Sequence, residues 1–173
     1  QPKAPRAPTI TIPTTIFHQF IKGSIIGFVP KVTMRIFFAG PLTDLPHPEA
    51  TKAFYVKLAD VAQKNGFDYF WAFLSGTDPI KNPKVTSRDV YERDIAQLEK
   101  SDCLVAYVGE PSTGTGLEIE HARIKNIPVY LLYEKGKNIS RMLLGCPSVK
   151  KEIAFTDESD ALSHFTSLLQ SLK

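Results

Sequence analysis

The chain has 173 residues, of which 43% are hydrophobic, 10% aromatic and 23% charged. This content allows one sizeable core, and it excludes a chain that is disordered throughout and a collagen-like fibre. The formal net charge of +3 is concentrated in residues 1–33, which hold four basic residues and no acid. The remainder is close to neutral, which argues against duplex DNA or RNA as a partner and favours a small molecule.

Hydropathy and cysteine content indicate the compartment. The best candidate for a membrane span, residues 16–29, is interrupted by Lys22 and is shorter than the roughly 18 apolar residues that a spanning helix needs. The two cysteines, Cys103 and Cys146, cannot form a disulfide framework and lie at no metal-ligand spacing. We therefore expect a cytoplasmic protein with no membrane partner and no metal site.

Residues 1–33 differ in composition from the rest of the chain. They contain prolines among threonines and basic residues, a composition that does not support a regular element. Three alternatives stay open: an organellar transit sequence, a translated leader upstream of a start at Met34, or a packed extension. We predict an N-terminal extension over 1–33 and one folded domain over 34–173.

From Val32 onward, short apolar runs alternate with amphipathic stretches, which is typical of βαβ units. Buried strands are predicted at Met34–Ala39, Tyr69–Phe73, Cys103–Val108, Val129–Tyr133 and, more weakly, Ile153–Phe155. Helices are predicted at Pro48–Asn65, Ser87 to about Lys100, Gly116–Lys125, Ile139–Leu144 and Ser159–Leu172. The predicted fold class is α/β, a three-layer sandwich with a five-stranded parallel sheet of the Rossmann or flavodoxin type. Ligands of such sheets bind at the carboxyl ends of the strands.

Unusual loops follow three of these strands. They are Gly40-Pro41-Leu42-Thr43, Trp71-Ala72-Phe73 and a segment with Ser112, Gly114 and Gly116. The last segment leads directly into a predicted helix, whose free N–H groups and positive dipole end favour an anion such as phosphate. Glycine is also a common turn residue, and the segment lacks the third glycine of a dinucleotide fingerprint and the Lys-Ser/Thr of a Walker loop.

Glu118 lies in the first turn of that predicted helix. The helix dipole favours a carboxylate that stays ionised near neutral pH, and such a carboxylate at a ligand crevice can act as a nucleophile. The alternative is a Glu that complements the dipole and takes no part in chemistry.

Asp94 is a second carboxylate in an unexpected place. It falls within the apolar stripe that is predicted to pack on the sheet, which consists of Val90, Tyr91, Ile95 and Leu98. A carboxylate there is costly unless it is paired or used, and the pairing alternative is an ion pair with Arg88 or Arg123. Two carboxylates near the strand ends suit cleavage of a glycosidic bond, in which one stabilises or attacks the sugar and the other handles protons.

A longer motif surrounds the two carboxylates. It runs Tyr91-Glu92-Arg93-Asp94, Leu98 and Ser101-Asp102-Cys103-Leu104-Val105-Ala106, followed by Pro111-Ser112, Gly114, Gly116 and Glu118. This motif, in which Glu118 lies 24 positions after Asp94, resembles the nucleoside 2-deoxyribosyltransferase superfamily. The similarity covers about Met34 to Leu169 and is greatest with the branch of nucleoside 5′-monophosphate N-hydrolases.

The resemblance assigns expected roles to the site residues. It implies that Glu118 attacks C1′ of the sugar and that Asp94 contacts the sugar or the departing base. It places Ser112 and Gly114 at the 5′-phosphate, and Gly40, Leu42 and Gly116 elsewhere along the substrate. Ser140 resembles a serine that reaches the phosphate of the neighbouring subunit, which implies a homodimer with composite active sites.

The chain departs from the pattern of this branch at two places. Where the hydrolases have Gly-Ser-Ile-Arg, Pro41 offers no N–H and Thr43 no charge, so phosphate affinity is lower or is supplied by Lys81, Lys84 or Arg88. The usual tyrosine of the first strand is Phe37 here, which removes a partner of Glu118 and leaves room for a ribose 2′-hydroxyl.

Trp71 and Phe73 are candidates for stacking on the base, and the alternative is that both are core aromatics, as we expect for Phe70. The expected function is hydrolysis of the N-glycosidic bond of a ribo- or deoxyribonucleoside 5′-monophosphate through a glycosyl ester of Glu118, without a cofactor. One alternative is a nucleoside 2-deoxyribosyltransferase, which passes the sugar to a second base. The other is a nucleotide-binding module that has lost catalysis.

Overall fold

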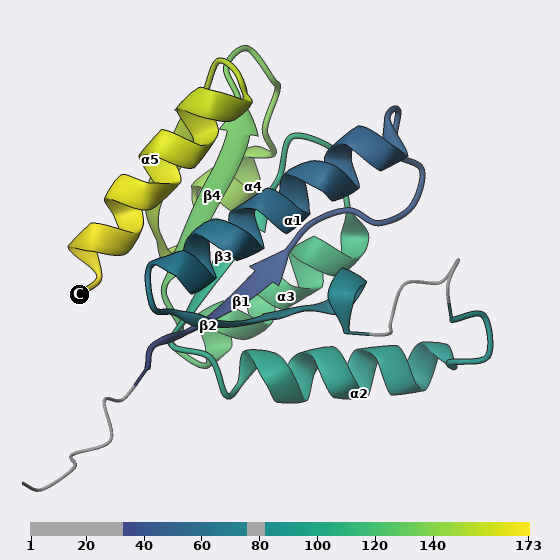
Figure 1. Ribbon diagram of the computed structural model, residues 1–173. Coiled ribbons are helices and arrows are strands. Elements are labelled where there is room, and N and C mark those ends of the chain that lie inside the picture. The colour runs from purple at the N-terminus through teal and green to yellow at the C-terminus, as the bar shows by residue number, and fades with distance from the viewer. Residues whose placement is uncertain (1–32, 76–81) are drawn as a thin grey trace, which may run out of the picture. The chain divides into compact units, whose positions relative to one another are not determined.

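The computed structural model describes residues 33–75 and 82–173 (Figure 1). The strands are β1 Arg35–Ala39, β2 Asp68–Trp71, β3 Cys103–Tyr107, β4 Val129–Glu134 and β5 Val149–Phe155. The helices are α1 Pro48–Lys64, the 3₁₀ turn η2 Ala72–Leu74, α2 Ser87–Leu98, α3 Thr113–Ile124, α4 Arg141–Leu144 and α5 Glu158–Ser171. No helix in this described part of the chain is long and apolar enough to cross a membrane. The predicted extension over 1–33 lies outside the described residues except for Thr33.

The five strands form one parallel sheet in the order β2-β1-β3-β4-β5, which confirms the predicted fold class. From β1 the chain moves outward to β2 and then returns across β1 to add β3 on its other side. At such a switch point the loops that follow two neighbouring strands diverge and leave a crevice at the carboxyl ends. The crevice is therefore expected beyond β1 and β3.

The two sides of the sheet are covered by different helices. In Figure 1, α1 and α5 lie in front of the sheet, and α3 and α4 lie behind it. We call the side under α1 and α5 the aromatic face, because it holds Phe38, Tyr55, Trp71 and Phe165. We call the other side the carboxylate face. Its core contains Phe37, Leu98 of α2, Leu104 and Ile119 of α3.

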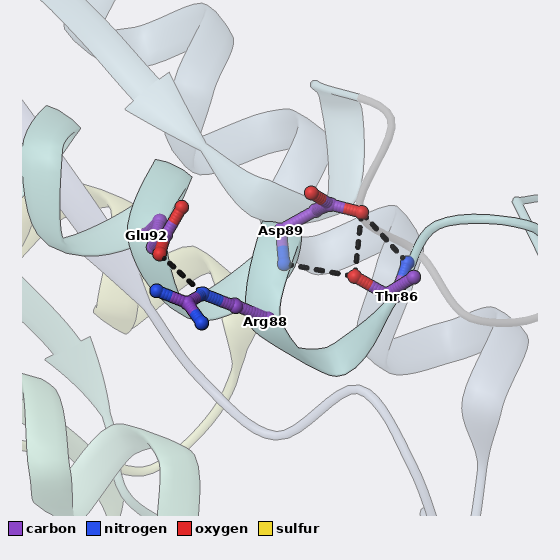
Figure 2. A network of polar contacts seen from close by, with 4 residues as sticks. All are labelled: Thr86, Arg88, Asp89 and Glu92. Carbon is purple, nitrogen blue, oxygen red and sulfur yellow. Dashed lines mark hydrogen bonds and ion pairs between the residues drawn. The ribbon is translucent and has the colours of Figure 1, made fainter.

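The helix α2 begins at a capping box (Figure 2). The Thr86 hydroxyl oxygen accepts a hydrogen bond from the Asp89 backbone N–H at 3.2 Å, and the Asp89 carboxylate accepts one from the Thr86 N–H at 3.1 Å. The prediction that Ser87 caps this helix is therefore wrong by one residue. The reciprocal bonds need an acid three residues after the cap, which Thr86 has and Ser87 does not.

The helix α3 begins at Thr113, three residues earlier than predicted, with Ser112 as its N-cap. Gly114, which was expected before the helix, and Gly116, which was expected as its first residue, therefore both lie inside the first turn. Glu118 moves from the predicted first turn into the second turn, where the favourable effect of the helix dipole on a carboxylate is weaker.

Candidate functional site

The buried stripe of α2 consists of Asp94 and Leu98. Tyr91, which we expected to pack on the sheet, is 57% exposed, because only a narrow stripe of this helix faces the core. Asp94 is 8% exposed, and its Oδ1 atom is buried without a hydrogen-bond partner among the described residues. Burial raises its pKa to about 6, and the positive charge of Arg93 opposes part of that rise.

The arginines that we considered as partners of Asp94 are engaged elsewhere. The Nε of Arg88 donates to Glu92 at 2.7 Å (Figure 2), and the Nη2 of Arg123 donates to Glu120 at 2.6 Å. The ion pairs proposed as a structural role for Asp94 are therefore not formed. The sequence offered three basic residues as sources of phosphate affinity. Of these, Arg88 is engaged by Glu92, Lys84 is exposed, and Lys81 lies outside the described residues.

Glu118 lies beside Asp94 on the neighbouring helix. Burial, together with the negative charge of Asp94, raises the pKa of Glu118 to about 8. We expected the helix dipole to keep this carboxylate ionised, and the shift has the opposite direction. The reason is that burial and the negative charge of Asp94 outweigh the helix dipole, which acts weakly on Glu118 because this residue lies in the second turn of α3. Near neutral pH the pair of carboxylates therefore shares one proton.

The N-terminus of α3 presents free backbone donors. The Ser112 hydroxyl oxygen accepts a hydrogen bond from the Thr115 N–H at 3.2 Å, and the Ser112 carbonyl accepts one from the Gly116 N–H at 3.1 Å. The N–H groups of Thr113 and Gly114 belong to the turn in which a helix has no acceptor of its own. Both N–H groups, like the hydrogen of the Ser112 hydroxyl, suit an anion.

The chain itself does not require glycine at positions 114 and 116. A Cβ atom on Gly116 would meet nothing within 4 Å, and one on Gly114 would meet only the Ser112 hydroxyl oxygen at 3.9 Å. Glycine inside a helix costs roughly 0.5–1 kcal/mol relative to alanine. Two glycines beside open space are what the close approach of a ligand to the backbone requires.

A pocket of about 240 Å³ lies next to this turn. Its wall is made by residues of the β3–α3 loop, the start of α3 and the α4 region, namely Val108, Gly109, Glu110, Pro111, Ser112, Thr115, Asn138, Ser140 and Leu143. Ser140 thus lines the same pocket as Ser112 within one chain. Thr115 and Asn138 were not among the predicted site residues, although a hydroxyl residue between two glycines is visible in the sequence.

The loop after β1 is held by the aromatic face. The Tyr55 hydroxyl donates to the Pro41 carbonyl at 2.9 Å, and a Cβ atom on Gly40 would lie 2.6 Å from that hydroxyl oxygen. Gly40 is therefore required for the approach of Tyr55. Leu42 packs against the cores of both faces, so it lies at the end of the sheet.

The aromatic residues expected at the base, Trp71 and Phe73, both lie on the aromatic face. Trp71 is stacked between Phe38 and Tyr55, with centroid distances of 4.5 and 4.4 Å, so both faces of its indole ring are covered by protein. Phe73 is buried against Tyr55 on the same side. Both residues therefore match the core alternative. The register of β2 directs Trp71 to the aromatic face, and Phe73 of the following turn η2 packs in the same cluster.

Phe37 lies on the carboxylate face, where its ring stacks on Phe70 at 5.4 Å. The phenylalanine pair thus forms the floor of the face on which Asp94 and Glu118 lie. Among the described residues, no group of three or more His, Cys, Asp or Glu side chains is arranged to hold a metal ion.

Two proteins that are similar to this chain in sequence carry the same name. A protein of Nematostella vectensis is 30% identical over 143 residues, which cover 78% of this chain and 95% of the relative. A protein of Methanosarcina mazei is 42% identical over 79 residues, which cover 46% of this chain and 49% of the relative, so the match spans about half of that relative. Both carry the name 2′-deoxynucleoside 5′-phosphate N-hydrolase 1 as a provisional assignment.

Solved structures share the fold. The CMP N-glycosidase of Clostridium botulinum superposes with a TM-score of 0.61 at 20% identity, over 78% of this chain and 98% of the other. A 2-deoxyribosyltransferase of Bacillus psychrosaccharolyticus gives a TM-score of 0.57 at 20% identity, over 78% and 95% of the two chains. The sequence profile of the nucleoside 2-deoxyribosyltransferase family matches residues 36–163, a range that contains both carboxylates and the α3 turn. The chain therefore belongs to the nucleoside 2-deoxyribosyltransferase family.

Proposed function

We propose that this chain is an N-glycosidase that cleaves the bond between base and sugar in a nucleoside 5′-monophosphate. The observation that carries the proposal is the buried, unpaired Oδ1 of Asp94 beside Glu118, since a buried carboxylate without a structural partner is costly unless it is used. The names of the relatives and of the Clostridium botulinum enzyme support a 5′-monophosphate as the substrate.

In the first step, the Glu118 carboxylate forms a bond to C1′ while the bond between C1′ and the base nitrogen breaks. The proton that the pair holds near neutral pH passes to the departing base, by way of Asp94. The base leaves neutral, and the sugar remains as an ester of Glu118. A pair with one proton thus supplies both the acid and the nucleophile.

In the second step, water attacks C1′ and the ester bond breaks. Asp94 takes one proton of that water, which restores the single proton of the pair. The products are the free base and the sugar 5-phosphate. The N–H groups of Thr113 and Gly114 and the hydroxyl of Ser112 bind the phosphate, and the space beside Gly114 and Gly116 lets it approach the backbone.

A mass-spectrometric screen tests this function. The enzyme is incubated with the common ribo- and deoxyribonucleosides and their 5′-monophosphates, and free base is measured. We expect base and sugar 5-phosphate from at least one monophosphate, at a higher rate than from the matching nucleoside. Binding of nucleotides without release of any base would instead identify a binding module that has lost catalysis.

The second candidate is base exchange, which uses the same ester of Glu118. It is favoured by the structural likeness to the Bacillus psychrosaccharolyticus 2-deoxyribosyltransferase. Adding a foreign base to enzyme and substrate distinguishes the two reactions. Hydrolysis leaves the foreign base unchanged, whereas transfer produces a new nucleoside or nucleotide.

We also propose that the active protein is a homodimer with composite sites. Three large apolar side chains are exposed and available to a second copy, namely Leu117 and Ile124, two turns apart on α3, and Met142 of α4, which is 87% exposed. Mixing Glu118→Gln chains with Ser140→Ala chains should restore activity if Ser140 serves the partner's site. If Ser140 serves the pocket of its own chain, the mixture should stay inactive.

A further inference from the structure

Thr115 has a hydroxyl group that the fold leaves without a hydrogen bond. The residue is 4% exposed, and its Oγ1 atom is buried without a partner among the described residues. Its backbone N–H is used, because it donates to the Ser112 hydroxyl oxygen. The residue belongs to the wall of the pocket of about 240 Å³ beside the first turn of α3.

Thr166 of α5 shows what a helical threonine does when its role is structural. Its hydroxyl donates to the Leu162 carbonyl, one turn earlier, at 2.8 Å. This bond is the usual solution for a hydroxyl on a helix. Thr115 lies at the third position of α3, where the equivalent carbonyl belongs to Pro111, and no such bond is formed.

The pocket that Thr115 lines is built from neutral donors. Ser112 and Ser140 contribute hydroxyl groups, and Asn138 contributes an amide. The acid in the wall, Glu110, is engaged by the Lys137 ammonium group at 2.5 Å. Neutral N–H and O–H donors at a helix N-terminus are suited to a tetrahedral oxyanion.

We propose that Thr115 is a specificity-determining residue whose buried hydroxyl donates a hydrogen bond to a phosphate oxygen of the substrate. The inference rests on the proposed function, because it takes the anion to be the 5′-phosphate of a nucleotide. The Thr115 hydroxyl is thus a further hydrogen-bond donor for the phosphate, in addition to the Ser112 hydroxyl and the helix N–H groups. Thr115 thereby distinguishes a nucleoside 5′-monophosphate from the free nucleoside.

The substitution Thr115→Val keeps the shape of the side chain and removes the donor. A lost hydrogen bond to a charged group should weaken binding of a 5′-monophosphate by about 10- to 100-fold. Binding of the matching nucleoside should change less than about twofold, because the nucleoside has no phosphate. Thr115→Ser should retain most of the preference, and Thr166→Val is the matched control in a helix without a ligand.

The experiment measures Kd for one 5′-monophosphate and its nucleoside by calorimetry, with the melting temperature of each variant. Since the Thr115 hydroxyl has no partner in the described part of the chain, Thr115→Val should melt at or above the wild-type temperature. Thr166→Val should melt lower and bind both ligands as the wild type does. Equal binding of the monophosphate by Thr115→Val and wild type would overturn the proposal, and so would equal losses for both ligands.

Calorimetry with inorganic phosphate separates this proposal from the proposed function. If the wild type releases no base from any nucleotide, the proposed function fails. Phosphate binding that depends on the Thr115 hydroxyl would still support the inference as an anion site. If base is released but phosphate and monophosphate bind Thr115→Val unchanged, the proposed function stands and the inference fails.

Discussion

The two faces of the sheet differ in whether their buried polar groups have hydrogen-bond partners within the protein. On the aromatic face, the Tyr55 hydroxyl donates to Pro41, the Tyr107 hydroxyl donates to Glu134, and rings stack on rings around Trp71. On the carboxylate face, Asp94 Oδ1 and Thr115 Oγ1 are buried without partners among residues 33–75 and 82–173, and two glycines lie beside open space. Within the same residues, Glu134 Oε2 on the aromatic face also lacks a partner, but its carboxylate is held through the other oxygen.

This difference indicates that one face of the sheet mainly stabilises the fold and that the other holds the groups for the reaction. A buried polar group without a partner costs about 1–3 kcal/mol, so a fold keeps such groups where a ligand completes them. The aromatic face carries the larger share of packing and also fixes the loop after β1. The buried polar groups of the carboxylate face lower the stability of the fold, and they are positioned to bind a substrate.

The largest expected effect on the carboxylate face comes from Glu118→Gln. This substitution keeps the size of the side chain and removes the nucleophile, so base release should fall by at least about 10³-fold while nucleotide binding persists. Glu120→Gln, two residues away and paired with Arg123 on the surface, is the matched control and should retain full activity. Near-normal turnover by Glu118→Gln would end the covalent mechanism.

Substitutions of Asp94 and Asp89, which lie on the same helix, should affect different properties, the first the rate of base release and the second the stability. Asp94→Asn should lower kcat by about 10²–10⁴-fold, because the proton transfer to the base is lost, and should leave the melting temperature near that of the wild type. Asp89→Ala removes the acceptor for the Thr86 N–H in the capping box and should cost roughly 1 kcal/mol of stability with little change in kcat. If Asp94→Asn unfolds the protein instead, the role of Asp94 is structural.

Phe37→Tyr tests the floor of the carboxylate face. Phe37 should favour acceptance of a ribose, so adding a hydroxyl there should shift the ratio of kcat/KM toward the deoxyribonucleotide by about ten- to a few hundred-fold. Trp71→Phe, on the opposite face, should lower stability and leave this ratio unchanged. A wild type that is strictly specific for deoxyribose, or a Phe37→Tyr variant with an unchanged ratio, contradicts the assignment.

The carboxylate pair should also make stability depend on pH. Burial raises both pKa values above those of an unfolded chain, to about 6 for Asp94 and about 8 for Glu118, so the folded protein disfavours the ionised forms. Their contribution is therefore most favourable in acid and is lost as pH rises toward 8, by roughly 3 kcal/mol or more in total. Denaturant unfolding at pH 5 and pH 9 should show this loss in the wild type. The double variant Asp94→Asn, Glu118→Gln should show much less of it.

The fold was largely predictable because its elements differ in hydrophobic period. The strands and α1 were placed to within a few residues, since their apolar runs are bounded by glycine and proline. Thr86 was missed as the cap of α2, although the sequence carries the acid of its capping box three residues later. The early start of α3 was missed because glycine has low helix propensity and masked the first turn.

The site was only partly predictable, because a face depends on register. Phe37 pairs with Phe70, and Phe38 pairs with Trp71, so the indole ring is directed away from the carboxylates. The sequence shows that Phe70 and Trp71 point to opposite sides, but it does not show which side carries Asp94. The raised pKa of Glu118 depends on the nearness of Asp94, which local sequence does not reveal either.

The position of β3 between α2 and α3 determines how the site residues are ordered along the chain. Asp94 precedes this fully buried central strand, and Glu118 and the turn of Ser112 follow it, so one continuous segment carries both carboxylates and the anion-binding turn. Insertions or circular permutation in the connections after β4 would leave the order of these residues within the segment unchanged. A break between Asp94 and Glu118 would instead place the two carboxylates on different segments of the chain.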